Sequence, residues 1–252
     1  MKEKLYEIPL NDAMDADEEC PFCFLERKAE QELMDFVLGS CASYMESDTR
    51  ERTDQAGFCR LHQKKMFDYG NALGNGWILK TYYKKLIKEM KEEFKDFTPG
   101  KASLKDRLTG KTGNSNSIHA WIAGKEKTCY ICDRYSERYE RYVATFFHLY
   151  KKDPAFREKL NHGKGFCFHH FAGLCSGADQ YLNEAGRKEF YPLVFQIMEQ
   201  NMERVSGDID WFIEKFDYLN REGDWKQSKD ALQRGMQKIR GGYPADPAYK
   251  LK

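Results

Sequence analysis

The sequence has 252 residues, and its 41 Lys and Arg nearly balance its 40 Asp and Glu, which gives a formal net charge of +1. This length can bury a sizeable core, while the charge balance excludes a global field that would attract nucleic acid or an anionic membrane. The first residues form no apolar signal segment, and no stretch approaches the roughly 18 apolar residues that a membrane span needs. We therefore expect a soluble, cytoplasmic protein with no membrane association. A nucleic-acid partner is not favoured and stays open only through the basic linker and tail.

A first repeat is predicted over residues 1–97. An acidic run precedes Cys20-Pro21-Phe22-Cys23, and apolar residues then recur at helical spacing from Leu25. A polar stretch ends at Gly57-Phe58-Cys59, where a second helix is expected to begin. A third helix carries an apolar stripe from Leu79 to Phe94, and its mixed Lys and Glu outer face is typical of a solvated surface.

Residues 98–127 are rich in Gly and Lys and have little periodicity, which predicts a linker. The second repeat, residues 128–220, restates the first. Cys129-Tyr130-Ile131-Cys132 is followed by an aromatic stripe at helical spacing, by a short helical segment from Asp153, and by Gly165-Phe166-Cys167.

The longest regular signal covers residues 191–219, where apolar residues alternate steps of four and three. Such a heptad seam predicts a long helix that needs a packing partner. We expect that partner to be the 79–94 helix of the same chain, with a second subunit as the alternative, so a monomer and a homodimer both stay open. Residues 221–252 add an amphipathic segment and a tail that is expected to fray after Gly241.

The cysteines and histidines of the two copies form two Cys3His ligand sets, each expected to bind one metal ion within its own repeat. The sets are Cys20, Cys23, Cys59 and His62 in the first copy and Cys129, Cys132, Cys167 and His170 in the second. Residues three apart on a helix share a face, so Cys167 can meet an ion together with His170 but not with His169. Four protein ligands close a coordination sphere, which favours two structural zinc ions over catalytic ones.

Other uses of these cysteines are also considered. A Cys3His set can hold an iron-sulfur cluster, which stays open as the alternative cofactor. A thioredoxin-like site would need a strand before Cys20, where an acidic run stands. A chain with no export signal favours metal over disulfides, and the two cysteines outside the sets, Cys41 and Cys175, are expected to be buried small apolar residues.

With its duplicated Cys-x-x-Cys and Gly-Phe-Cys-x-x-His motifs and a C-terminal segment that bears Trp225, the chain resembles an uncharacterised bacterial family of unknown function. The resemblance covers most of the chain and depends on motif layout. It implies no activity, so the ligand assignments depend on spacing.

Together these patterns predict an all-α fold. Two pseudo-repeats of antiparallel helices would each be pinned at one end by a Cys3His metal site and joined by the long heptad helix. The metal would supply folding free energy that a short repeat lacks. The favoured function is a zinc-stabilised scaffold, adaptor or regulatory binding protein for a protein or small-molecule partner. An iron-sulfur or redox protein and an enzyme with its site between the repeats are the alternatives, and because no catalytic residues stand out, a non-enzymatic role is favoured.

Overall fold

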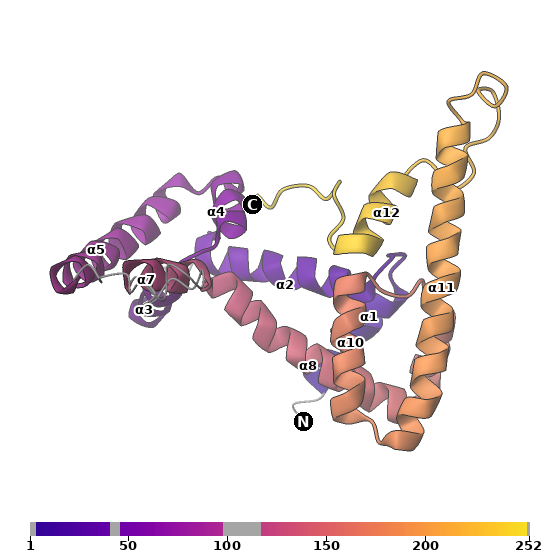
Figure 1. Ribbon diagram of the computed structural model, residues 1–252, viewed down its shortest axis with the longest axis horizontal. Helices are drawn as coiled ribbons and strands as arrows, with labels where there is room; N and C mark the ends of the chain where they lie inside the picture. The colour runs from indigo at the N-terminus through magenta and orange to yellow at the C-terminus, as the bar shows by residue number, and fades with distance from the viewer. Residues whose placement is uncertain (1–3, 41–45, 98–116, 251–252) are drawn as a thin grey trace, which may run out of the picture. The chain divides into compact units, whose positions relative to one another are not determined.

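The computed structural model describes residues 4–40, 46–97 and 117–250. All regular structure in these ranges is helical, which confirms the predicted all-α class (Figure 1). The helices are α1 (Lys4–Asp15), α2 (Pro21–Leu38), α3 (Ser47–Ala56), α4 (Arg60–Tyr69), α5 (Ala72–Asp96), α7 (Ser117–Glu126), α8 (Tyr130–Lys152), α9 (Pro154–Asn161), α10 (Phe168–Tyr181), α11 (Glu184–Glu214) and α12 (Ala231–Arg240). None of the described helices is long and apolar enough to cross a membrane.

The sequence duplication is visible as a repeated order of helices. In the first copy α2, α3, α4 and α5 follow one another, and in the second α8, α9, α10 and α11 do so with the same alternation of long and short helices. Cys41 and residues 98–116 of the predicted linker lie outside the described residues. The described end of that linker is helical in α7, and α1 lies in the first copy before its Cys-x-x-Cys motif; neither helix was predicted.

Polar side chains fix the starts of several of these helices. Asp153 accepts a hydrogen bond from the backbone N–H of Ala155 at 2.9 Å, and Pro154 follows it in the first helical position of α9. Asn183 caps α11 in the same way through the N–H of Gly186 at 2.8 Å. A side-chain oxygen at this position satisfies an N–H that has no partner within the helix, so these residues define where the helices begin.

The chain divides into two compact units, which cut across the two sequence copies. Unit 1 comprises Met1–Ala29 and Glu137–Pro247, and unit 2 comprises Glu30–Ser136 and Ala248–Lys252. The helices α2 and α8 each contribute residues to both units. Each compact unit thus combines parts of both sequence copies. The predicted division follows the order of the sequence instead, as 1–97, 98–127, 128–220 and 221–252.

The core of unit 1 is dominated by aromatic rings. Phe146 on α8 packs against Phe22 on α2, against Phe166 immediately before α10, and against Phe190 on α11, with ring centroids 6.0 to 6.4 Å apart. All four side chains are buried. Aromatic side chains bury large areas and interlock edge to face, so this cluster is a major source of stability for the unit.

The core of unit 2 is smaller and more aliphatic. It contains Val37 from α2, Met66 from α4, Ile78 from α5 and Ile131 from α8. Around it, α5 packs against α3, α4 and α7. Unit 2 therefore has fewer buried apolar side chains than unit 1 among the described residues, and other interactions matter more for its stability.

The long helix packs differently from the prediction. α11 lies beside α10 and α12 in unit 1 (Figure 1), whereas the expected partner, residues 79–94, belongs to α5 in unit 2. The buried residues of α11 include Val194, Ile197 and Val205, while Phe195 of the predicted seam is exposed. A straight helix has 3.6 residues per turn, so a strict heptad does not stay on one face unless the helices supercoil.

The C-terminal segment also differs from the prediction. The buried residues of α12 include Arg234 and Lys238, and the apolar side chains Met236 and Ile239 are exposed. The tail after α12 was expected to fray, but Asp246 pairs with Arg27 at 3.0 Å. Polar contacts rather than an apolar stripe therefore fix the position of this segment.

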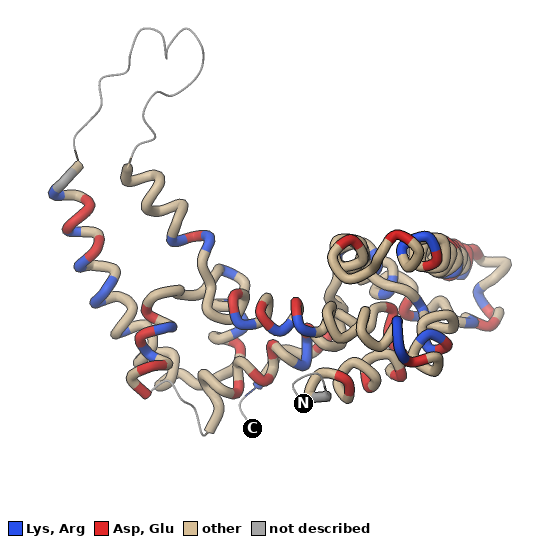
Figure 2. The backbone as a smooth tube through the Cα atoms, turned by 90° about the horizontal axis from the view of Figure 1, so that it is seen from below, with Lys and Arg blue, Asp and Glu red and all other residues tan. Residues whose placement is uncertain are grey.

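Opposite charges are interleaved along the helices in the part of the chain that Figure 2 colours. Acidic and basic residues alternate over short distances on α5, which carries the mixed Lys and Glu face predicted for the third helix. The distribution is in keeping with the balanced composition.

Candidate metal centres

Each Cys-x-x-Cys motif lies at the start of a long helix. Pro21 is the first residue of α2, directly after Cys20, and Cys23 lies within the first turn. In the second copy Cys129 directly precedes α8, and Cys132 lies in its first turn. Two thiols in one helical turn can converge on one point, so each motif supplies half of a tetrahedral ligand set.

Each Gly-Phe-Cys-x-x-His motif makes a tight turn into a short helix. Gly57 and Gly165 have φ angles of 63° and 77°, which other residues adopt only with strain. The turn leaves Cys59 and Cys167 as the residues that cap α4 and α10. The histidine three residues later then lies on the same side of the helix as the cysteine, as predicted.

The structure pairs these half-sites across the two copies and not within them. Site I comprises Cys20, Cys23, Cys167 and His170, and site II comprises Cys59, His62, Cys129 and Cys132. In each site the four ligand atoms all lie within 4.8 Å of one another. All eight predicted ligand residues are thus brought into two clusters, but the expected grouping of Cys20 and Cys23 with Cys59 and His62 is wrong.

The reason for the crossed pairing is visible in the backbone. The first Cys-x-x-Cys lies at the start of α2, and the 18 residues of this helix rise by about 27 Å before the rest of the copy begins. The start of α8, and not the start of α2, lies beside Gly57. There the N–H of Tyr130 donates to the Gly57 carbonyl at 2.9 Å. The hydroxyl of Thr128 donates to the Ala56 carbonyl at 2.7 Å. These bonds hold the second Cys-x-x-Cys against the first Gly-Phe-Cys.

Site I is completely enclosed. The Nδ1 atom of His170 lies 3.5 Å from the sulfurs of Cys20 and Cys23 and 3.2 Å from that of Cys167. The sulfurs of Cys23 and Cys167 are 3.7 Å apart. All four residues are buried, and the rings of Phe22 and Tyr139 lie against the imidazole.

Site II has nearly the same internal geometry and a different exposure. The Nδ1 atom of His62 lies 3.3 Å from the sulfur of Cys59, 3.2 Å from that of Cys129 and 3.4 Å from that of Cys132. Cys129 and His62 are buried, but Cys59 is only partly buried and Cys132 is exposed. The sulfurs of Cys59 and Cys132 are 3.9 Å apart.

In both sites a glutamate on α2 faces the second nitrogen of the imidazole. Glu30 accepts a hydrogen bond from Nε2 of His62 at 2.7 Å and also contacts Lys65 and Tyr249 at 2.6 Å. Glu26 lies 3.8 Å from Nε2 of His170. A carboxylate in this position keeps the proton on Nε2 and leaves Nδ1 free to bind a metal. Nothing in the motif spacing had indicated these two residues.

The ionisation of site II suits a cation. Burial opposes protonation of His62, but its contacts with Cys129 and Glu30 outweigh burial and raise the pKa of the imidazole to about 10. Burial also opposes ionisation of Cys129, yet the hydrogen bond with His62 lowers the pKa of this thiol to about 6. A proton and a metal ion compete for Nδ1, so binding of a metal would release protons from this cluster.

In site I the neighbouring thiols shift one another's pKa in opposite directions. The contacts with Cys20 and Cys23 lower the pKa of Cys167, whereas the contact with Cys167 raises the pKa of Cys23. Adjacent buried sulfurs cannot all ionise, because their negative charges repel one another at low dielectric. A divalent cation would remove this repulsion, so the donor set fits a metal ion.

The remaining candidates lie elsewhere. His169 is exposed, as expected for the histidine that was excluded as a ligand. Cys175, which was expected to be buried, is partly exposed, and Cys41 lies outside the described residues. The described cysteines are all free thiols.

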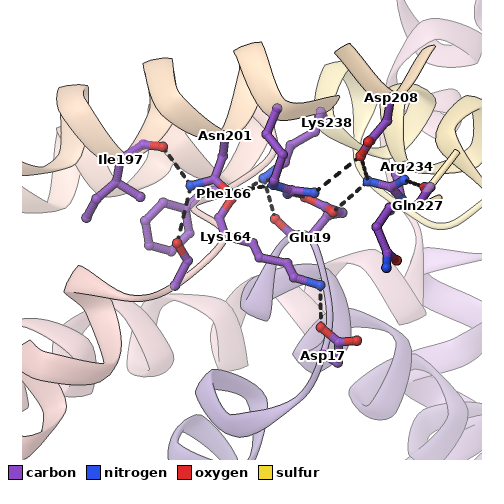
Figure 3. Close-up of polar contacts among 12 residues, drawn as sticks. Asp17, Glu19, Lys164, Phe166, Ile197, Asn201, Asp208, Gln227, Arg234 and Lys238 are labelled. Atoms are coloured by element: carbon purple, nitrogen blue, oxygen red, sulfur yellow. Dashed lines mark hydrogen bonds and ion pairs between the residues drawn. The ribbon is translucent and has the colours of Figure 1, made fainter. Parts of the chain in front are cut away.

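A buried charge cluster fixes the chain just before site I (Figure 3). Glu19 accepts a hydrogen bond from Arg204 on α11 at 2.6 Å and forms an ion pair with Lys238 on α12 at 3.1 Å. Lys238 also donates to the carbonyl groups of Glu19 and Lys164. Because Glu19 directly precedes Cys20 and Lys164 nearly adjoins Cys167, Lys238 holds together the two segments that form site I.

The fold and these clusters define an all-helical protein with two Cys3His-type clusters that are compatible with metal binding. The chain belongs to a family of unknown function, DUF6062, which matches residues 1–246. This agrees with the resemblance drawn from the duplicated motifs. Comparison with curated proteins and with solved structures gives no match.

Proposed function

We propose that the protein is a helical scaffold stabilised by two structural zinc ions, one in each Cys3His cluster, and that it acts as a binding or adaptor protein. The observation that supports this most is the geometry of the ligand atoms. Metal bonds of 2.3 Å to sulfur and 2.0 Å to nitrogen in a tetrahedron require about 3.8 Å between sulfurs and about 3.5 Å between sulfur and nitrogen. The sulfur–sulfur contacts are 3.7 and 3.9 Å, and the sulfur–nitrogen contacts are 3.2 to 3.5 Å.

The same distances favour a single ion over an iron-sulfur cluster. A cluster distributes its protein ligands over several iron atoms, with inorganic sulfide between them. In both sites all four ligand atoms lie within 4.8 Å of one another, which leaves room for one ion at their centre. Zinc is the ion we propose, because a closed tetrahedral set of sulfur and nitrogen donors is typical of its structural sites.

A structural role is supported by the positions of the ligands in the sequence. Site I joins residues 144 to 150 positions apart, and site II joins residues 67 to 73 positions apart within that loop. Closing long loops costs conformational entropy, which the metal offsets only in the folded chain. Two nested closures of this kind would stabilise units that are built from separate stretches of sequence.

A binding function is favoured over chemistry at the metal. Four protein ligands leave no position for a substrate or a catalytic water. Unit 2 also carries an apolar groove of about 230 Å³ beside α4 and α5, whose lining includes Phe58, Ile78 and the exposed side chains Phe67 and Leu79. Apolar grooves of this kind are common contact surfaces of binding proteins.

Elemental analysis of natively purified protein tests the proposal. We expect two equivalents of zinc per chain and no absorption in the visible range. Iron with sulfide and a brown colour would replace the zinc scaffold with an iron-sulfur protein. A folded protein that holds no metal after purification and binds none on addition of zinc would refute both.

A further inference from the structure

The two clusters differ in how well they are protected from solvent, although their ligand sets are the same. In site I all four residues are buried. In site II, Cys132 is exposed and Cys59 is only partly buried. Reagents in solution can therefore reach thiolates in site II without any opening of the fold.

The cover over site I comes from several parts of unit 1. The chain after α12 passes so close that a Cβ atom on Gly241 would lie 3.3 Å from the sulfur of Cys167 and 3.6 Å from that of Cys23. Phe166, which directly precedes Cys167, is also buried, and Phe22 packs against the imidazole of His170. A reagent could reach these sulfurs only after the segment around Gly241 or the aromatic core had moved.

We propose that site II is an oxidative modification site, at which peroxide converts Cys132 and Cys59 into a disulfide and thereby releases the metal. The inference rests on the proposed function, because it requires that site II hold a metal. It adds that one of the two centres is labile and responds to oxidants, while the other is permanent.

The chemistry needs only a peroxide as the oxidant. The exposed thiolate of Cys132 attacks one oxygen of hydrogen peroxide, which gives a sulfenic acid and hydroxide. The thiolate of Cys59 then attacks the sulfenic sulfur, and the S–S bond forms as a second hydroxide leaves. Two electrons pass from the two sulfurs to the peroxide, and the metal loses two of its four ligands.

Geometry selects Cys59 as the second cysteine. Its sulfur lies 3.9 Å from that of Cys132 and is itself partly exposed. The two atoms must approach by about 2 Å to reach the length of a disulfide bond. Cys129 is buried and therefore less accessible than Cys59, so it is expected to stay with the histidine.

The test uses the full chain in a Cys41→Ser/Cys175→Ser background, so that only ligand cysteines react. Metal content is measured first, and hydrogen peroxide is then added in the presence of a chromogenic chelator. We expect one of two zinc equivalents to be released at least about tenfold faster than the other, because site I must open before it reacts. Peptide mapping should show a disulfide between Cys59 and Cys132, with the site I cysteines still reduced.

Two matched variants separate the exposed from the buried thiol. Cys132→His and Cys129→His each leave site II a Cys2His2 set, which also binds zinc. Cys132→His should abolish the fast release, whereas Cys129→His should retain it, since Cys132 and Cys59 are still present.

Several results would overturn the inference while leaving the proposed function intact. These are release of both equivalents at equal rates, release from site I first, and retention of both metals after peroxide treatment. If a variant fails to hold two metals, the time course and the disulfide map of the parent protein decide. Absence of metal from the untreated protein would instead count against the proposed function.

Discussion

Sites I and II show how the same ligand set behaves in two different surroundings. Site I lies in the aromatic core of unit 1, closed by the segment after α12 and by the charge cluster at Glu19. Site II lies beside the smaller core of unit 2, where Glu30 orients His62 and Cys132 faces solvent. Motif spacing determines which atoms could bind a metal, whereas packing around the motif determines how well the ligand atoms are protected from solvent.

Loss of a ligand should affect site I more than site II. Cys167→Ser should remove one metal and lower the free energy of unfolding by several kcal/mol, because the ion contributes folding free energy and the site sits inside the larger core. Cys59→Ser should also remove one metal but should destabilise the protein less. Metal analysis combined with urea denaturation measures both effects, and equal losses of stability would contradict the difference between the sites.

The buried charge cluster should also contribute to the stability of unit 1. Lys238→Met removes the ion pair with Glu19 and the contact with the Lys164 carbonyl. We expect a loss of roughly 2–4 kcal/mol in the free energy of unfolding, since Arg204 compensates the buried carboxylate only in part. Lys188→Met is the matched control, because Lys188 pairs with Glu184 at the surface and should have little effect. If Lys238→Met lowers the free energy of unfolding no more than Lys188→Met does, the charge cluster is not needed for stability.

The glutamates on α2 should matter more for site II. Glu30→Gln removes the charge that orients His62, and we expect zinc affinity at site II to fall roughly 10–100-fold. Glu26→Gln is the corresponding change at site I and should have a smaller effect, because that carboxylate lies 3.8 Å from the imidazole and not 2.7 Å. Competition with a chelator of known affinity measures both. If the two changes have equal effects, the shorter contact does not strengthen the site.

Much of the fold could be predicted from the sequence. Apolar periodicity indicated α2, α5, α8 and α11, because helices that pack on one face repeat apolar residues at fixed spacing. The spacing of Cys167 and His170 also identified the histidine that the structure places in the cluster with Cys167. These are local properties that follow from helix geometry alone.

The pairing of the half-sites could not be predicted in the same way. Each half-site, such as Cys129 with Cys132, is chemically equivalent to its copy, so no sequence spacing indicates which two halves meet. The choice depends on long-range contacts such as the one between Tyr130 and Gly57. The burial of Lys238 was missed for a related reason, because its partner Glu19 is distant in sequence.

The crossed pairing can be tested most directly by the metal content of double variants. Cys59→Ser/Cys132→Ser alters two ligands of site II and should leave one zinc equivalent per chain, whereas Cys23→Ser/Cys59→Ser alters one ligand in each site and should leave none. Pairing within each copy predicts the reverse. Retention of one equivalent by Cys23→Ser/Cys59→Ser, together with loss of both from Cys59→Ser/Cys132→Ser, would contradict the crossed arrangement.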